Sequence, residues 1–294
     1  MTQIIENLAE VSARYKALFV DLWGCVHNGI APFPDAVAAL QAYRKTGGKV
    51  ILVTNAPRPR ASVEKQLTKM GLPRDAWDSI ATSGDSARSA MYRGAVGQKV
   101  YFIGEDHDQS FFSPLGLLND AVEITKVPLD QADGIVCCGP FDASAHPDVN
   151  RPDFLYAKTK GMKLLCANPD IVVDRGEVRE WCAGALAQLY TDMGGESLYF
   201  GKPHPPIYDL ARRRLTALGD NIPDAEILAI GDGIHTDVAG AMGEDLDVLF
   251  ITGGLAAAET KTLHDPAAKP DAAALTGFLE KSMLSPAYAF GFLR

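Results

Sequence analysis

Polar side chains that could perform chemistry stand at the ends of apolar runs and in one later loop. Asp21 follows the run YKALFV, Thr54 and Asn55 close KVILVTN, and Asp232 closes EILAIGD. Lys202 stands in the segment FGKPHPP, just before a helical pattern. Taken singly, each residue fits an ordinary cap, turn or solvated side chain. Their shared position, always at a strand end or an element junction, favours one site in which Asp21 is an acid positioned to act.

Apolar runs with the length of buried strands predict a parallel α/β sheet that would position these residues. The runs cover residues 17–21, 49–55, 226–232 and 247–253. Helical patterns separate them, and the first begins near Phe33 with Asp35 as its predicted N-cap. Ligands bind beyond the carboxyl ends of the strands in such a sheet. We therefore expect the polar groups that follow these runs to meet.

The middle of the chain shows the same alternation of strand and helix patterns. Its strand-like runs lie at residues 99–105, 121–127, 134–140 and 162–168. We predict an α/β fold with a doubly wound, Rossmann-like parallel-sheet core formed by residues 1–84 and 195–294. Residues 85–194 would be inserted into this core as an α/β cap domain.

Two local patterns give finer predictions. The Asn28-Gly29 pair is a two-residue hairpin signal, which predicts a small β-flap just beyond Asp21. The aromatic and apolar end SPAYAFGFLR is expected to pack on the body of the protein, with a homodimer contact as the alternative.

Composition and missing motifs exclude several classes of function. The 294 residues are 47% hydrophobic with a net charge of −9, which argues against nucleic acid or an anionic membrane as the main partner. Five cysteines without CxxC spacing indicate reduced thiols. The absence of a leader pattern and of an apolar run of about 18 residues predicts a cytoplasmic protein. No dinucleotide fingerprint, nucleotide loop, serine elbow or HExxH motif is present.

The segments FVDLWG, VTN, GKP and GDGIHTD together resemble the four-motif series of the haloacid dehalogenase (HAD) superfamily. The similarity is greatest to its class IIA phosphatases, which carry an α/β cap between the second and third motifs. It covers nearly the whole chain and includes HNG of the flap, TSG at residues 82–84 and NPD at residues 168–170. It implies a small phosphorylated metabolite as substrate, and cap segments 168–170 and 174–181 that face the core.

The resemblance also implies roles for the residues at the strand ends. Asp21 would be the nucleophile that attacks phosphorus and forms an aspartyl-phosphate. Mg²⁺ would be held by Asp21, Asp232 and the main-chain carbonyl of Trp23. Lys202 would neutralise the developing charge and hold the nucleophile in place.

The remaining motif residues would bind phosphate or support the centre. Thr54 and Asn55 would bind the phosphate group, with Trp23 and His27 beside the substrate. Asp237, five residues after Asp232, would brace a metal-bound water or Lys202.

Trp23 departs from the phosphatase pattern, in which the second residue after the nucleophile is another Asp. A main-chain carbonyl of any residue can bind the metal, but an indole can neither protonate a leaving oxygen nor deprotonate water. Loss of a general acid/base typically costs about 10²–10⁴ in rate. The expected function is therefore a Mg²⁺-dependent phosphate-monoester hydrolase with altered general acid/base chemistry.

Several explanations for Trp23 remain open. The substrate could have a good leaving group, or another residue could replace the acid, with His27 favoured over His204 and His235. The chain could instead cleave a different bond, as the dehalogenases and phosphonate-cleaving members of the superfamily do. Finally, it could be a catalytically weak protein that binds a phosphate ligand or has a regulatory role.

Overall fold

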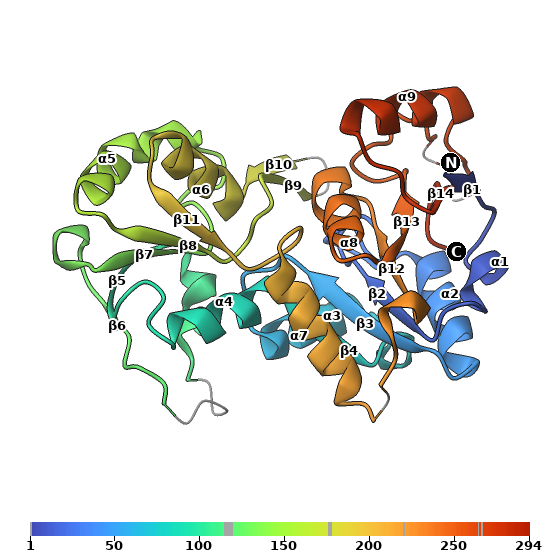
Figure 1. Ribbon diagram of the computed structural model, residues 1–294, viewed down its shortest axis with the longest axis horizontal. Coiled ribbons are helices and arrows are strands. Elements are labelled where there is room, and N and C mark those ends of the chain that lie inside the picture. Colours follow the sequence, from blue (N-terminus) through green and yellow to red (C-terminus); the bar gives the residue numbers. More distant parts are fainter. Residues whose placement is uncertain (1, 115–119, 176–177, 220, 264, 266) are drawn as a thin grey trace. The chain divides into compact units, whose positions relative to one another are not determined.

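The protein, described by a computed structural model, forms two compact units (Figure 1). The structure describes residues 2–114, 120–175, 178–219, 221–263, 265 and 267–294. The first unit comprises residues 1–54, 65–81 and 208–294, and the second comprises residues 55–64 and 82–207. Within the described ranges, no helix has both the length and the apolar character needed to cross a bilayer.

A seven-stranded sheet in the order β1-β14-β13-β12-β2-β3-β4 forms the first unit. Its strands are β1 (Gln3–Ile4), β2 (Ala17–Val20), β3 (Lys49–Thr54), β4 (Ser79–Thr82), β12 (Ile227–Gly231), β13 (Asp247–Ile251) and β14 (Tyr288–Phe290). Strand β2 pairs in parallel with both β12 and β3, and all its residues are buried. The carboxyl ends of these three strands therefore lie at one edge of the sheet.

Helices and short turns connect the strands of the first unit, and two helices begin in residues of the second. They are α1 (Ala9–Ser12), α2 (Pro34–Lys45), α3 (Arg60–Met70), η1 (Arg74–Ala76), α7 (Pro205–Thr216), η5 (Asp224–Glu226), η6 (Ile234–Val238), α8 (Ala239–Gly243) and α9 (Ala272–Ser282). The predicted aromatic end is confirmed to pack on the body, because β14 pairs with β13.

A five-stranded sheet in the order β11-β8-β7-β5-β6 forms the second unit, and its pairings are parallel. Its elements are β5 (Lys99–Ile103), β6 (Thr125–Lys126), β7 (Gly134–Cys137), β8 (Lys163–Cys166), β11 (Glu196–Tyr199), α4 (Ser83–Met91), η2 (Asp106–Phe112), η3 (Leu129–Gln131), η4 (Pro147–Asn150), α5 (Arg151–Thr159) and α6 (Ala183–Asp192). A separate antiparallel hairpin joins β9 (Val172–Arg175) to β10 (Val178–Trp181). Residues 176–177 of the predicted core-facing segment lie outside the described residues.

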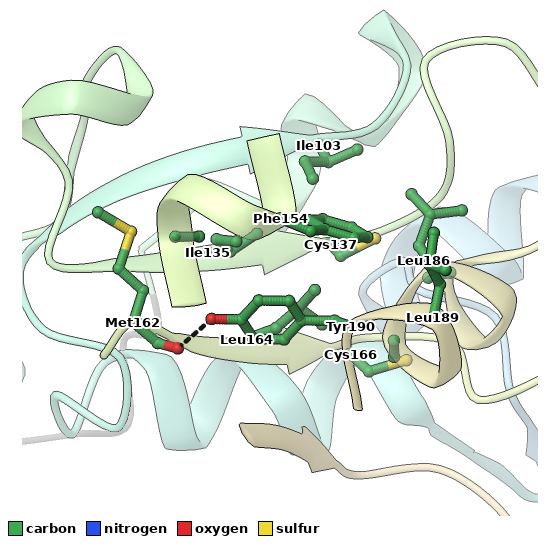
Figure 2. Packing of buried hydrophobic residues seen from close by; sticks show 13 residues of the cluster. Ile103, Ile135, Cys137, Phe154, Met162, Leu164, Cys166, Leu186, Leu189 and Tyr190 are labelled. Carbon is green, nitrogen blue, oxygen red and sulfur yellow. Dashed lines mark hydrogen bonds between the residues drawn. The ribbon is translucent and has the colours of Figure 1, made fainter. Parts of the chain in front are cut away.

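Helices α5 and α6 supply much of the core of this second unit (Figure 2). Phe154 of α5 and Tyr190 of α6 are fully buried, with their ring centroids 5.2 Å apart. The Tyr190 hydroxyl donates a hydrogen bond to the Met162 carbonyl at 2.6 Å, so this buried polar group is satisfied. Both parallel sheets with their helices confirm the predicted α/β fold, with a Rossmann-like core and a separate second region.

Of two local predictions, the one for the N-cap of the first long helix was wrong. Helix α2 begins at Pro34, and Phe33 rather than Asp35 occupies the N-cap position; Asp35 lies in the first turn, where its charge favours the helix dipole. The predicted β-flap is present as a short antiparallel turn: His27 forms an antiparallel bridge with Pro32, and the Phe33 N–H donates to the Val26 carbonyl at 2.8 Å. Asn28 directs this loop, because its Oδ1 accepts hydrogen bonds from the N–H groups of Ile30 and Ala31.

Candidate active site

A buried pair of acids lies at the carboxyl edge of the seven-stranded sheet. Asp21 follows β2 and Asp232 follows the neighbouring strand β12, and the Asp21 N–H donates to the Ile230 carbonyl at 2.8 Å. One carboxylate oxygen of each acid and the Sγ of Cys25 lie within 4.8 Å of one another. All three residues are buried. The predicted meeting of Asp21 and Asp232 is thus present in the structure.

Two glycines allow the main chain to approach Asp232 closely. A Cβ on Gly24 would lie 2.2 Å from Asp232 Oδ2, and one on Gly254 would lie 2.0 Å from the same oxygen. Gly24 also has φ of +78°, a conformation that favours glycine. The same Oδ2 accepts a hydrogen bond from the Leu255 N–H at 3.0 Å. The loop after β2 is therefore packed directly onto this acid.

The donor set of this cluster fits a divalent cation. Buried carboxylates are costly unless positive charge or hydrogen bonds compensate them. Carboxylate oxygens on two adjacent strand ends are the ligands that Mg²⁺ prefers. Asp21 and Asp232 would hold such an ion.

Asp237 shapes the segment that carries Asp232. It lies in the π-helical turn η6 and is buried, and its Oδ2 accepts a hydrogen bond from the Gly233 N–H at 3.1 Å. A Cβ on Gly231 would come within 2.1 Å of the Asp237 Cγ. Asp237 therefore positions the residues on both sides of Asp232, and its expected contact with a metal-bound water or Lys202 stays a prediction.

Trp23 and His27 lie together in the loop after β2. Their rings meet edge to face, with centroids 5.3 Å apart, and a Cβ on Gly29 would lie 2.5 Å from the indole. His27 is buried, and its Nδ1 accepts a hydrogen bond from the Gly29 N–H at 3.0 Å. This bond places the proton of the neutral ring on Nε2. Burial also lowers the pKa of His27 to about 4, so the imidazole is neutral near pH 7.

Asn55 and Lys202 meet in the second unit. The Asn55 side-chain oxygen accepts from the Lys202 N–H at 2.7 Å, and its Nδ2 donates to the Lys202 carbonyl at 3.1 Å and to Asp170 Oδ1 at 2.8 Å. Gly201 is required beside them, because a Cβ there would lie 2.4 Å from Asn55 Oδ1. The Asn55 amide thus fixes the main chain on both sides of Lys202, a buried lysine.

The other predicted residues have separate surroundings. Thr54 is buried at the end of β3, the neighbour of β2. His204 stacks on Tyr199 with ring centroids 4.8 Å apart, and burial lowers its pKa. His235 is exposed in η6. Three groupings result: Asp21 with Asp232, Trp23 with His27, and Asn55 with Lys202; their assembly into one centre stays a prediction.

Comparison with known proteins identifies the family. A family model described as haloacid dehalogenase-like hydrolase matches residues 18–117, and one described as HAD-hydrolase-like matches residues 199–278. A crystal structure of a haloacid dehalogenase-like hydrolase from Brucella suis 1330 is 36% identical. The match covers 99% of this chain and 100% of that one, with a TM-score of 0.84.

Two curated relatives are more distant in sequence. A 5'-nucleotidase of Bacillus subtilis (strain 168) is 24% identical over 254 residues, which cover 84% of this chain and 91% of the relative. A D-glycerol 3-phosphate phosphatase of Mycobacterium tuberculosis is 24% identical over 269 residues, which cover 90% of this chain and 70% of the relative. The chain belongs to the haloacid dehalogenase-like hydrolase family, as an enzyme of its class IIA phosphatase-like type.

Proposed function

We propose that this enzyme hydrolyses a small phosphate monoester, with Asp21 as the nucleophile and Mg²⁺ held by Asp21, Asp232 and the main-chain carbonyl of Trp23. The observation that carries the proposal is the buried Asp21–Asp232 pair at adjacent strand ends. The curated relatives named as a 5'-nucleotidase and a glycerol phosphate phosphatase support a small phosphorylated metabolite as substrate.

The chemistry would proceed in two displacements at phosphorus. The Asp21 carboxylate attacks phosphorus while the bond to the leaving oxygen breaks, which gives an aspartyl-phosphate and an alkoxide or phenolate that takes a proton from solvent. Water then attacks the same phosphorus and releases phosphate, which regenerates Asp21. When bound, the cation supplies positive charge that offsets the repulsion between carboxylate and phosphate. Lys202 adds a second positive charge, and the Thr54 hydroxyl donates a hydrogen bond to the phosphate.

Proton transfer to the leaving group distinguishes this enzyme from the common phosphatase pattern. Trp23 has no group that can transfer this proton. His27 is a weak substitute, because its Nδ1 lone pair is already used by the Gly29 N–H and its pKa is about 4. We therefore propose a phosphate monoester whose leaving oxygen departs with little help, such as an aryl phosphate.

The second unit would act as the cap that selects the substrate and excludes water. In this proposal the Asn55 amide is a positioning group that orients Lys202, and phosphate contacts come from Thr54 and main-chain N–H groups. Buried cysteines that form no disulfide suit the cytoplasmic location that the sequence predicts.

Steady-state kinetics with an aryl phosphate and an alkyl phosphate test the proposal. Protein stripped with a chelator should be inactive and regain turnover when Mg²⁺ is added. Asp21→Asn should lower kcat with the aryl phosphate by about 10³-fold or more. Far-UV circular dichroism of the variant controls for folding. Turnover that persists in Asp21→Asn would exclude the assigned nucleophile, whereas Mg²⁺ binding without turnover of any substrate would favour a binding protein.

A further inference from the structure

A third potential ligand atom stands beside the two acids. The Cys25 Sγ and one carboxylate oxygen each from Asp21 and Asp232 lie within 4.8 Å of one another, and Cys25 is only 1% exposed. Cys25 is not part of any motif that the resemblance or the proposed mechanism uses. The local fold therefore places a soft sulfur donor next to two hard oxygen donors.

The loop after β2 fixes the main chain around this sulfur. The N–H groups of Val26 and His27 both donate to the Leu22 carbonyl, at 2.8 and 3.1 Å, and the Gly24 N–H donates to the His27 carbonyl at 2.9 Å. These bonds enclose Cys25 in a tight reversal of the chain. The backbone conformation of this loop therefore places the thiol near the two acids.

The three atoms, all within 4.8 Å of one another, lie within about 0.3 Å of the spacing that one ion requires. A zinc-like ion binds thiolate at about 2.3 Å and carboxylate oxygen at about 2.0–2.2 Å, so two of its ligands can be up to about 4.5 Å apart. Thiolate ligands favour ions such as Zn²⁺, Co²⁺ and Cd²⁺, whereas Mg²⁺ strongly prefers oxygen. The Cys25 sulfur therefore strengthens the binding of Zn²⁺, Co²⁺ or Cd²⁺ but not that of Mg²⁺.

We propose that Cys25 adds a thiolate ligand to the metal site of Asp21 and Asp232, so that this thiophilic site binds Zn²⁺, Co²⁺ or Cd²⁺ more tightly than the two carboxylate oxygens alone would. Binding converts the Cys25 S–H into a metal–sulfur bond and releases one proton to solvent, without oxidation or reduction. The inference rests on the proposed function, because it uses the same pair of acids. It adds Cys25 as a further ligand and predicts tighter binding of thiophilic ions.

Titration of the full-length protein with Cd²⁺, without substrate, tests this site. Wild-type protein should show the ultraviolet charge-transfer absorption of a cadmium–thiolate bond. Cys25→Ser should lose this absorption and bind Cd²⁺ at least about tenfold more weakly, while its Mg²⁺ affinity changes less than about threefold. Asp232→Asn should also weaken Cd²⁺ binding by about tenfold or more. Cys166→Ser, which removes a buried thiol of the second unit, should bind Cd²⁺ as the wild type does.

The outcomes separate this inference from the proposed function. An unchanged charge-transfer band and Cd²⁺ affinity in Cys25→Ser would overturn the thiophilic site, even if the enzyme hydrolyses phosphate esters. A band that is lost in Cys25→Ser but unaffected by Asp232→Asn would overturn the shared set of ligands. Loss in both variants together with no turnover in wild type would keep the site and refute the proposed function. If Cys25→Ser fails to fold, ¹¹³Cd NMR of wild type decides, since ligation by oxygen and nitrogen alone would contradict the proposal.

Discussion

The two parallel sheets end in different chemistry. Strands β2 and β12 of the first sheet lead into Asp21 and Asp232, whose carboxylates lie near each other. Strands β7 and β8 of the second sheet end in Cys137 and Cys166, whose thiols face the main-chain carbonyls of the loops that follow. Burial raises the pKa of the Cys166 thiol to about 12 and that of Cys137 well above its ordinary value.

This difference shows that a parallel sheet brings residues at adjacent strand ends together, whereas the types of those residues determine whether they can bind a cation or only pack in the core. Both sheets bring adjacent strand ends together, and both pairs of residues are buried. In the first, acids with close glycines leave a centre suited to a cation. In the second, the thiols stay neutral and act as small apolar core residues. The predictions below test this contrast, starting with the largest effect.

Removing an acid from the first sheet should have the largest effect. We expect Asp232→Asn to lower kcat with an aryl phosphate by about 10³-fold, because a neutral amide binds Mg²⁺ weakly. Cys166→Ala, at the matching place in the second sheet, should stay within about twofold of wild type. Steady-state kinetics at saturating Mg²⁺ measure both. Equal losses in the two variants would mean that the strand ends do not differ in function.

Removing the side chain that holds Lys202 should have an intermediate effect. Asn55→Ala loses both hydrogen bonds to the main chain of Lys202, so kcat should fall by about 10- to 100-fold with little change in KM. Asn150→Ala is the matched control, because its Nδ2 also donates to a main-chain carbonyl in the second unit. If Asn55→Ala loses as much thermal stability as the control but keeps a normal kcat, the role of Asn55 is only structural and the prediction is wrong.

Restoring an acid at position 23 should raise activity selectively. Trp23→Asp should hydrolyse an alkyl phosphate up to about 10²-fold faster than Trp23→Asn, a variant of similar size without an exchangeable carboxyl proton. With an aryl phosphate the two variants should differ by less than about threefold, since that leaving group needs little protonation. Parallel kinetics with both substrates measure the ratio. A similar gain on both substrates would refute the leaving-group argument.

The buried thiols of the second sheet should make the free energy of unfolding fall as the pH becomes alkaline. The unfolded chain releases the Cys166 proton near the ordinary pKa of 9.0, whereas the folded chain keeps it to about 12, chiefly because of burial. The contribution to stability is therefore complete below pH 9 and is lost as pH rises toward 12. Between pH 8 and pH 10 this loss is about 1.4 kcal/mol. Urea unfolding should show a shallower decrease over this range in Cys166→Ala than in wild type, and parallel decreases would contradict the assignment.

The sequence was most informative where a single acid follows a buried apolar run. The predicted strand at residues 17–21 corresponds to β2 at Ala17–Val20, and the pairing of β2 with β12 then brings Asp21 toward Asp232. The sequence pattern did not predict helix α6. It is buried on nearly all sides, so its apolar residues show no one-sided helical stripe.

Side-chain use was harder to predict than position. The sequence did not predict that the Asn55 amide bonds the main chain of Lys202, 147 residues later in the chain; its expected role in phosphate binding stays a prediction. Cys25 was missed because it approaches the acids only through the reversal of the chain after Gly24. Such contacts depend on the conformation of loops, which cannot be predicted from the spacing of residues in the sequence.

The most direct measurement of the central claim is chemical trapping of the phosphorylated enzyme during turnover of an aryl phosphate. Acid quenching, borohydride reduction and peptide mass spectrometry would convert an aspartyl-phosphate into homoserine and locate it. We predict homoserine at position 21, dependent on both Mg²⁺ and substrate. Reduction at any other residue, or phosphate release by Asp21→Asn at the wild-type rate, would contradict the account.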